Sequence, residues 1–356
     1  MAEDGKARPH ARPSYHGVLS IAGSWHCWPD VILVGDMGGT KTTLALVDAA
    51  RPLAVEHTTT VASRDHATAA DLIGTYAEPH RARIHAACIG VPGPVIGDTA
   101  KATNLPWMIR RDDIAERLGG IPVMLLNDLE ACGWGLALLP PDRFAVLQDG
   151  VPDARGNRAL IAAGTGLGEA GLFWDGTRHV PFASEGGHAD LAPRTPREVR
   201  LLEFLAQRHG HVSWERAVSG GGLLNIFEFL REAEGMAVPA ALAEALLRER
   251  EHDPAVVSGA ALAERAPIAV EALDMFTRLF GAEAGNLALK LKATAGVYLA
   301  GGIAPKILPK LQDGTLVAAF VDKGRFRELL QGIPVRVVLD QATALYGAAR
   351  FAAEHC

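Results

Sequence analysis

The feature that most constrains the fold is a strand–turn–strand unit that occurs twice. Each unit has an apolar run, a glycine-rich turn and a second apolar run, in VGDMGGTKTT at residues 34–43 and in NRALIAAGTGLGEAGLFWDG at residues 157–176. After the first turn, Leu44 and Leu46 alternate with other side chains at a period of two, which is typical of a strand. The repetition predicts an internal duplication, with one unit in each of two domains and the two turns facing each other across a cleft.

The first turn combines glycines, a lysine and an acid. It is not a Walker A loop, because the spacing before Lys41 is too short, and it is not a dinucleotide-binding loop, because a strand follows it. Backbone N–H groups in a glycine turn can hold phosphate oxygens, and Mg²⁺ reconciles Asp36 with those phosphates. The alternative is an ordinary hairpin in which Asp36 is a turn residue. This stretch alone leaves both interpretations open.

Two further glycine turns follow the same design. YLAGGIAP (298–305) ends an apolar run, and VSGGGLLN (218–225) precedes an apolar stretch with helical spacing. With 38 glycines in the chain, one such cluster arises by chance, whereas four beside apolar runs are harder to dismiss. Strands that alternate with helices in both halves predict an α/β architecture.

Composition excludes several classes of partner. The 356 residues allow two domains, and a net charge of −6 without a basic block argues against a nucleic-acid partner. The four cysteines lack CxxC spacing, which argues against zinc sites and disulfides and fits a reducing compartment. No apolar run reaches the length of a membrane span, so we expect a soluble, cytoplasmic protein. Residues 1–30 lack a signal-peptide pattern, and we expect a poorly ordered extension or a start codon placed too early.

An acid stands where a predicted strand meets a predicted helix in IPVMLLNDLEACGWGLAL (121–138). The strand at 123–126 runs into Asn127 and Asp128, and a helix-like stretch follows. One interpretation of Asp128 is a helix N-cap. The other is a carboxylate at the carboxyl edge of a parallel sheet, where α/β proteins place their ligands.

A polar loop and a second acid follow later in the chain. SEGGHADLAP (184–193) places Glu185 and His188 around two glycines, which predicts a loop. A zinc site is disfavoured, because Asp190 is the only further ligand type nearby. A carboxylate and an imidazole also suit sugar hydroxyls, which both donate and accept hydrogen bonds. Glu215 falls in a predicted helix, where an exposed glutamate is the commoner case.

Together these motifs identify a family resemblance that runs from about Val31 to the end of the chain. The chain resembles the bacterial glucokinases of the enterobacterial type, within the hexokinase/actin/Hsp70 superfamily. The motifs occur in the order VGDMGGTK, ATNLPW, LLNDLEA, AAGTGLGEA, SEGGHADLAP, GHVSWERAVSGGGLLNI, GNLALKL, VYLAGGIAPK and AFVDKGRF. The resemblance implies an α/β fold of the two-domain ribonuclease-H-like actin/hexokinase type, with duplicated mixed β-sheet units and a cleft between the domains. It also implies a small domain at 31–138 plus 340–356, a large domain at 139–339 and a homodimer.

The resemblance further implies an ATP-dependent kinase that phosphorylates D-glucose at its 6-hydroxyl, with Asp128 as the catalytic base and Asp36 holding Mg²⁺ through water. The residues expected to bind glucose are Asn104, Asn127, Asp128, Glu185, His188 and Glu215. The residues expected to bind ATP are Gly35, Asp36, Met37, Gly38, Gly39, Thr40, Lys41, Gly164, Thr165, Gly166, Gly168, Ser219, Gly220, Gly301 and Gly302.

Departures from the family pattern leave alternatives open. The enterobacterial relatives tend to carry asparagine at Lys41, so the phosphate contact there differs. Asn104 and Trp107 resemble an NxxW pattern that lies beside the sugar in related kinases. The cysteine-rich zinc motif of the repressor/kinase branch is absent near His188, and no winged-helix region precedes Val31, which disfavours a sugar-sensing regulator. A nucleotide-gated, chaperone-like protein would lack Asn127, Asp128, Glu185 and His188. Within enzymes, the alternative is a kinase for fructose, mannose or an N-acetylhexosamine.

Overall fold

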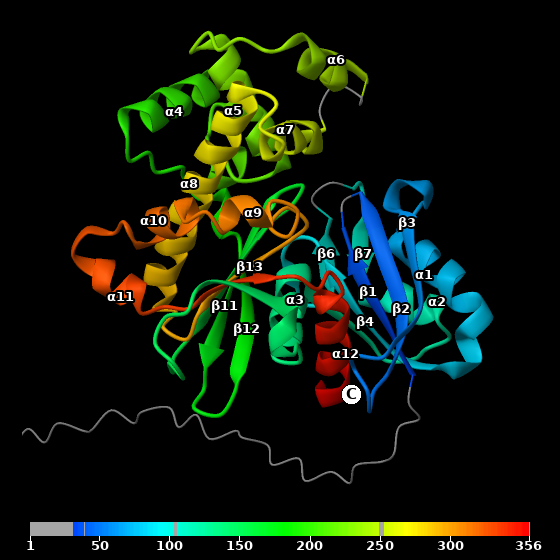
Figure 1. Cartoon of the computed structure of the whole chain (residues 1–356). Coiled ribbons are helices and arrows are strands. Elements are labelled where there is room, and N and C mark those ends of the chain that lie inside the picture. Colours follow the sequence, from blue (N-terminus) through cyan, green and yellow to red (C-terminus); the bar gives the residue numbers. More distant parts are fainter. Residues whose placement is uncertain (1–30, 39, 103–104, 249–252, 356) are drawn as a thin grey trace, which may run out of the picture.

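The computed structural model describes residues 31–38, 40–102, 105–248 and 253–355, and two large sheets form the framework of this part of the chain (Figure 1). The first sheet has the strand order β3-β2-β1-β4-β8, with β1 (Val31–Met37), β2 (Lys41–Asp48), β3 (Val55–Ala62), β4 (Ile84–Val91) and β8 (Val123–Asn127). The second has the order β12-β11-β10-β13-β14-β9, with β9 (Phe144–Gln148), β10 (Arg158–Ala163), β11 (Leu167–Trp174), β12 (His179–Ser184), β13 (Val297–Ala300) and β14 (Val335–Val338).

The two sheets repeat one topology. In the first, β1, β2 and β3 are antiparallel neighbours, while β4 and β8 continue parallel to β1. In the second, β10, β11 and β12 are antiparallel neighbours, while β13 and β14 continue parallel to β10. The second sheet adds β9 as an antiparallel edge strand. This arrangement confirms the predicted duplication and the predicted α/β fold.

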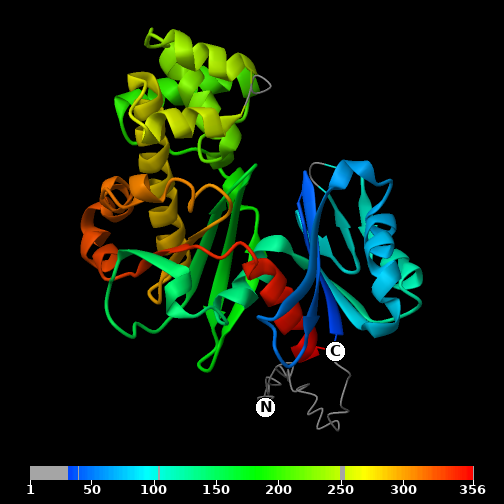
Figure 2. The same cartoon turned by 45° about the vertical axis from the view of Figure 1, so that its right-hand side comes forward.

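Helices pack on both faces of the first sheet. Leu33 and Leu44 point to one face, against α1 (Ala69–Ala77) and α2 (Arg111–Arg117). Side chains of alternate residues point to the other face, because successive strand residues alternate. There, Val34 packs near α3 (Asp128–Leu136) and α12 (Thr343–His355). The chain therefore ends beside the sheet with which the described region begins (Figures 1 and 2).

Most of the helices lie on the side of the second sheet. One face packs on α8 (Pro267–Leu291), which is largely buried, and α4 (Pro196–His209), α5 (Gly220–Glu232), α6 (Ala240–Arg248) and α7 (Pro254–Leu262) lie above it in Figure 1. Gly281 and Gly285 allow α8 to approach the backbone of α10 (Thr315–Val321), because a Cβ on either would overlap a carbonyl oxygen there. The opposite face packs on α3, through Leu160 and Leu172.

Helix α3 therefore lies between the two sheets and touches both. It packs tightly on α12, where a side chain on Gly347 would overlap the backbone of Ala131 and one on Gly135 would overlap that of Thr343. This close approach fixes the start of α3 relative to both halves.

The remaining elements are peripheral. They are the small antiparallel sheet of β5 (Val95–Ile96), β6 (Thr99–Lys101) and β7 (Met108–Arg110), and the short helices α9 (Leu308–Leu311) and α11 (Arg327–Gln331). Among the described residues, no helix combines the length and apolar character that a membrane crossing needs.

Candidate active site

A cleft of about 460 Å³ lies between the two sheets, and both predicted phosphate turns line it. The start of α3, the loop after β12 and the segment before α12 complete its walls. The cleft brings together many of the predicted site residues, namely Asp36, Gly38, Asn127, Asp128, Gly164, Thr165, Gly166, Gly168, Glu185, His188, Glu215, Gly301 and Gly302. These residues come from both halves of the chain, as the duplication predicted.

The first turn is a tight hairpin. Its last strand pair joins Met37 to Thr42, and the Gly38 N–H donates to the Lys41 carbonyl at 2.8 Å. A Cβ at Gly38 would lie 2.8 Å from that carbonyl oxygen, so glycine is required at this close approach. Ser63 supports the turn from outside, because its hydroxyl donates to the Gly38 carbonyl at 3.0 Å. Local pattern did not indicate Ser63, which directly follows β3.

Asn127, not Asp128, is the N-cap of α3. The Asn127 Oδ1 accepts hydrogen bonds from Leu129 N at 3.0 Å and Glu130 N at 3.2 Å, and its Nδ2 donates to the Gly93 carbonyl at 3.1 Å. The capping interpretation of Asp128 is therefore wrong. Asp128 is the first residue of the helix, and its side chain lines the cleft.

The cleft is acidic. Its lining includes the carboxyl groups of Asp36, Asp128, Glu185, Glu215 and Asp340, and no lysine or arginine from the described residues. Burial raises the pKa of Asp36 to about 6. Burial and then the charge of Asp36 raise the pKa of Asp128 to about 7. A ligand with several phosphate charges needs a cation to enter such a site, so the donor set fits Mg²⁺.

The loop after β12 presents Glu185 and His188 to the cleft. It forms a single 3-10 turn at Gly186–His188, consistent with the predicted loop. Both side chains are about half exposed, and the Glu185 Oε2 lies 3.9 Å from the His188 Nε2. Asp190 instead pairs with His211 at 2.8 Å, and the described residues contain no cluster of three metal-ligating side chains.

Glu215 supports the second turn through a hydrogen bond to its backbone. It lies in a short 3-10 turn, Trp214–Arg216, rather than in the predicted helix, and α5 begins later, at Gly220. The Glu215 Oε2 accepts a hydrogen bond from Leu167 N at 2.9 Å, at the end of the glycine turn. This contact crosses a long stretch of sequence, so local pattern could not predict it. The Gly220 N–H donates to the Gly164 carbonyl at 2.8 Å, which places the start of α5 against the same turn.

Several predicted residues stand outside the lining of the cleft. Met37 is fully buried in the core, and Gly35 packs between Ile89 and Leu44 within the sheet. Thr40 and Lys41 are exposed at the hairpin, while Ser219 caps α5. Asn104 and Gly39 lie outside the described residues. Conversely, Asp340 and Gln341 were not predicted, yet they line the cleft just after β14. An acid directly after the apolar run at 337–339 was the signal available there.

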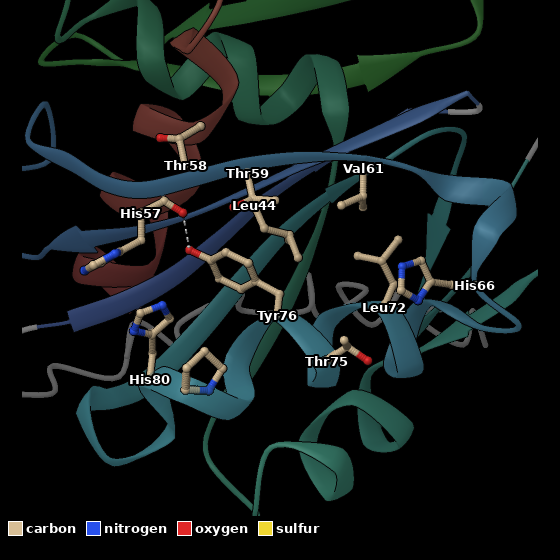
Figure 3. Close-up of a pocket in the computed structure, with 11 residues that line it drawn as sticks. Leu44, His57, Thr58, Thr59, Val61, His66, Leu72, Thr75, Tyr76 and His80 are labelled. Atoms are coloured by element: carbon tan, nitrogen blue, oxygen red, sulfur yellow. Dashed lines mark hydrogen bonds between the residues drawn. The ribbon is translucent and has the colours of Figure 1, made fainter.

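A second hollow, of about 400 Å³, lies between β3 and α1 (Figure 3). The rings of His57 and His80 lie tilted against each other at one end, with their centroids 4.4 Å apart, and the Tyr76 hydroxyl donates to the His57 carbonyl at 2.9 Å. None of the predicted site residues lines this hollow. The acidic cleft is therefore the candidate active site.

Known proteins match the chain over nearly its whole described length. The family model for glucokinase matches residues 33–355. The glucokinase of Nostoc punctiforme is 39% identical over 338 residues, covering 91% of this chain and 99% of the relative. A glucokinase from an Antarctic psychrotroph has 28% sequence identity and a TM-score of 0.75, covering 90% of this chain and 98% of that one. A ROK family glucokinase from Streptomyces griseus, solved in complex with glucose and AMPPNP, has 22% identity and a TM-score of 0.63, covering 90% and 98%.

Proposed function

The chain belongs to the glucokinase family, and from this premise we infer that it transfers a phosphoryl group from ATP to D-glucose, giving glucose 6-phosphate. The observation that carries the assignment is the meeting of Asp128 with two glycine turns in one acidic cleft. Family membership also disfavours the chaperone-like and regulator alternatives, and the residues that would distinguish them, such as Glu185 and His188, are present.

Asp128 is proposed as the base that accepts the proton of the sugar's 6-hydroxyl. General base catalysis is most effective when the pKa of the base lies near the working pH, and burial raises the pKa of Asp128 to about 7. The Leu129 N–H donates to its Oδ1 at 2.8 Å, which fixes the carboxyl group at the first turn of α3. One carboxylate oxygen is therefore oriented by the helix, and Oδ2 is left for the substrate.

Asp36 is proposed to hold Mg²⁺ through water, because it lines the cleft beside the first phosphate turn. When bound, the ion neutralises charge on the phosphate oxygens of the nucleotide. The backbone N–H groups of Thr165 and Gly166, in the second turn, would supply hydrogen-bond donors to those oxygens, whereas the N–H groups of Gly38 and Gly164 already donate to carbonyls within their own turns. Gly301 and Gly302, after β13, face the same space and are proposed to lie beside the nucleotide.

Glu185 and His188 are proposed to hold the sugar hydroxyls. Both present half-exposed polar atoms to the cleft, as a site for hydroxyl groups requires. Asn127 and Glu215 also line the cleft, but each already binds backbone groups, so each offers the sugar only its remaining hydrogen-bonding capacity. Asn104 keeps its predicted role as a proposal, since it lies outside the described residues.

The domain limits, a small domain at 31–138 plus 340–356 and a large one at 139–339, also stay a proposal. The packing of α12 on β1 and α3 supports joining the end of the chain to the first sheet. A homodimer and a cytoplasmic location likewise remain predictions from the sequence.

Kinetics on a panel of sugars test the assignment. Glucose, mannose, fructose and N-acetylglucosamine would be compared in a coupled assay, with ATP or polyphosphate as donor and with Mg²⁺ present or chelated. We expect the highest kcat/KM for glucose with ATP, and loss of turnover on chelation. A higher kcat/KM for another hexose would reassign the substrate. If ATP were hydrolysed as fast in the absence of sugar as in its presence, the protein would be reassigned as an ATPase.

A further inference from the structure

A buried pair of carboxyl groups lies directly behind the loop of residues 184–188. Glu169, in β11, is 1% exposed, and Glu283, in α8, is 0% exposed. Their carboxyl groups lie close enough to form a hydrogen bond with each other. The function proposed above uses neither residue.

Glu283 has the partners of an ionised carboxylate. The Asn286 Nδ2 donates to its Oε2 at 2.7 Å, and the Lys290 ammonium donates to its Oε1 at 3.1 Å. The Lys323 ammonium in turn donates to the Asn286 Oδ1 at 2.6 Å, which orients the amide toward Glu283. The negative charge of the pair therefore belongs on Glu283.

Glu169 lacks such partners. Its Oε1 is buried, and no donor among the described residues forms a hydrogen bond to it. Two ionised carboxylates in contact and away from water would repel each other strongly. A proton on Glu169 removes both problems, because the acid then donates to Glu283, whose oxygens have lone pairs to spare.

Glu169 also supports the loop that carries Glu185 and His188. A Cβ on Gly186 would overlap the Glu169 Oε2, so this carboxyl group lies against the backbone of the loop. The Ser184 hydroxyl donates to the Glu169 carbonyl at 3.0 Å and accepts from Gly186 N at 3.3 Å. The loop therefore contacts both the backbone carbonyl and the side chain of Glu169.

We propose that Glu169 is a positioning residue for the loop of residues 184–188, and that it works as a neutral acid whose proton is shared with Glu283. The proposal rests on the proposed role of that loop in binding glucose. Loss of the proton would drive the two carboxylates apart and displace Gly186. The loop would then bind glucose more weakly.

Several other charged groups face this pair. They are Lys290 from α8 and Lys323 after α10, while Glu185 and His188 on the adjacent loop line the cleft. Burial, and next the charge of Glu283, raise the pKa of Glu169 to about 8. Burial lowers the pKa of Lys323 to about 8, so a control must separate the two groups.

The test is the pH dependence of KM for glucose between pH 6.5 and about 9, with kcat followed in parallel. A group of pKa about 8 whose ionised form binds poorly raises KM by about tenfold at a pH one unit higher. We expect this rise of KM in the wild type, with kcat following only the ionisation of Asp128, whose pKa is about 7. We expect a flat KM in Glu169→Gln, whose amide keeps the hydrogen bond to Glu283. Lys323→Met should keep the wild-type rise.

A Glu169→Gln variant with the wild-type rise, or a wild type with a flat KM, would overturn the proposal. Infrared difference spectra give a readout that a merely structural role would not move, namely a protonated-carboxyl band at pH 7 that disappears in Glu169→Gln. Glu185→Gln separates the two proposals. If Glu185→Gln leaves KM unchanged, the sugar-loop assignment fails; if it raises KM while Glu169→Gln follows the wild-type profile, only the role of Glu169 fails.

Discussion

The two glycine hairpins share a backbone plan but place their acids on opposite faces. The last strand pair before the turn is Met37 with Thr42 in the first hairpin and Ala163 with Leu167 in the second. By this register Asp36 corresponds to Ala162, and both line the cleft. Leu44 corresponds to Glu169, and both point away from the cleft into the helical core.

The difference assigns separate tasks to the two copies. The first hairpin puts its carboxylate where ligand and metal can reach it. The second keeps the cleft face small with Ala162 and presents backbone, while its own acid is buried behind the sugar loop. A duplicated fold therefore need not duplicate chemistry, because function depends on which face of each strand carries the polar group. The following substitutions test this division, from the largest expected effect to the smallest.

Asp128→Asn tests the group that both hairpins serve. The amide keeps size and most hydrogen bonding but cannot accept the proton, so we expect turnover to fall by roughly two to four orders of magnitude while hexose binding largely survives. Steady-state kinetics and glucose titration measure the two effects. Turnover within a few-fold of wild type would remove Asp128 from the mechanism. Asn127→Ala is the control for the helix cap, and it should lower the free energy of unfolding by about 1 kcal/mol.

Asp36→Asn tests whether the acid of the first hairpin holds Mg²⁺. It gives the first hairpin an uncharged residue at the position where the second has Ala162. We expect the Mg²⁺ concentration for half-maximal turnover to rise by about tenfold to a hundredfold, as for other groups that hold a metal indirectly. Because the charge of Asp36 raises the pKa of Asp128, the substitution should also lower that pKa.

Asp340→Asn is the matched control in the same cleft. Asp340 comes from the second half, and its Oδ1 already accepts from Ala342 N at 2.9 Å. Its loss should change the Mg²⁺ requirement much less. An equal effect at both positions would mean that the cleft needs only negative charge, and that the first hairpin has no special part in holding the metal.

The contrast also explains what the sequence could and could not predict. The hairpins were predictable because period-two alternation and glycine turns are local signals. The start of α3 was predictable to within one residue, but choosing Asn127 over Asp128 as the cap required backbone geometry. The contact of Glu215 with Leu167 N and the pairing of Glu169 with Glu283 join distant segments. Such contacts follow from tertiary packing, to which pattern and propensity are blind.

Glu185→Gln and His188→Ala test the loop that the second hairpin supports. Removing one partner from a hydroxyl-binding site leaves polar groups unpaired and costs about 1–3 kcal/mol. We therefore expect weaker glucose affinity and relaxed discrimination among sugars, measured by KM across the sugar panel, with kcat less affected. Metal analysis of the purified protein is the companion measurement. Stoichiometric, tightly bound zinc would overturn the sugar-binding interpretation.

Glu169→Gln tests the buried acid of the second hairpin through stability rather than activity. Its pKa is raised in the folded state from 4.5 to about 8, so the folded protein keeps a proton that the unfolded chain releases. The resulting stability is complete below about pH 4.5 and is lost as pH rises toward about 8. The glutamine variant has no such loss, so its free energy of unfolding should gain on the wild type between pH 5 and pH 8.

The expected gain is on the order of 4 kcal/mol by pH 8, because the pKa rises from 4.5 to about 8 and each pKa unit corresponds to about 1.4 kcal/mol. Urea unfolding at a series of pH values measures it. Glu198→Gln is the matched control, since Glu198 is also buried but accepts a hydrogen bond from Arg194 N. Its glutamine variant should show no gain that grows with pH. If Glu169→Gln also showed no gain that grows with pH, Glu169 would be ionised in the folded protein. The acids of the two hairpins would then differ in their position but not in their charge.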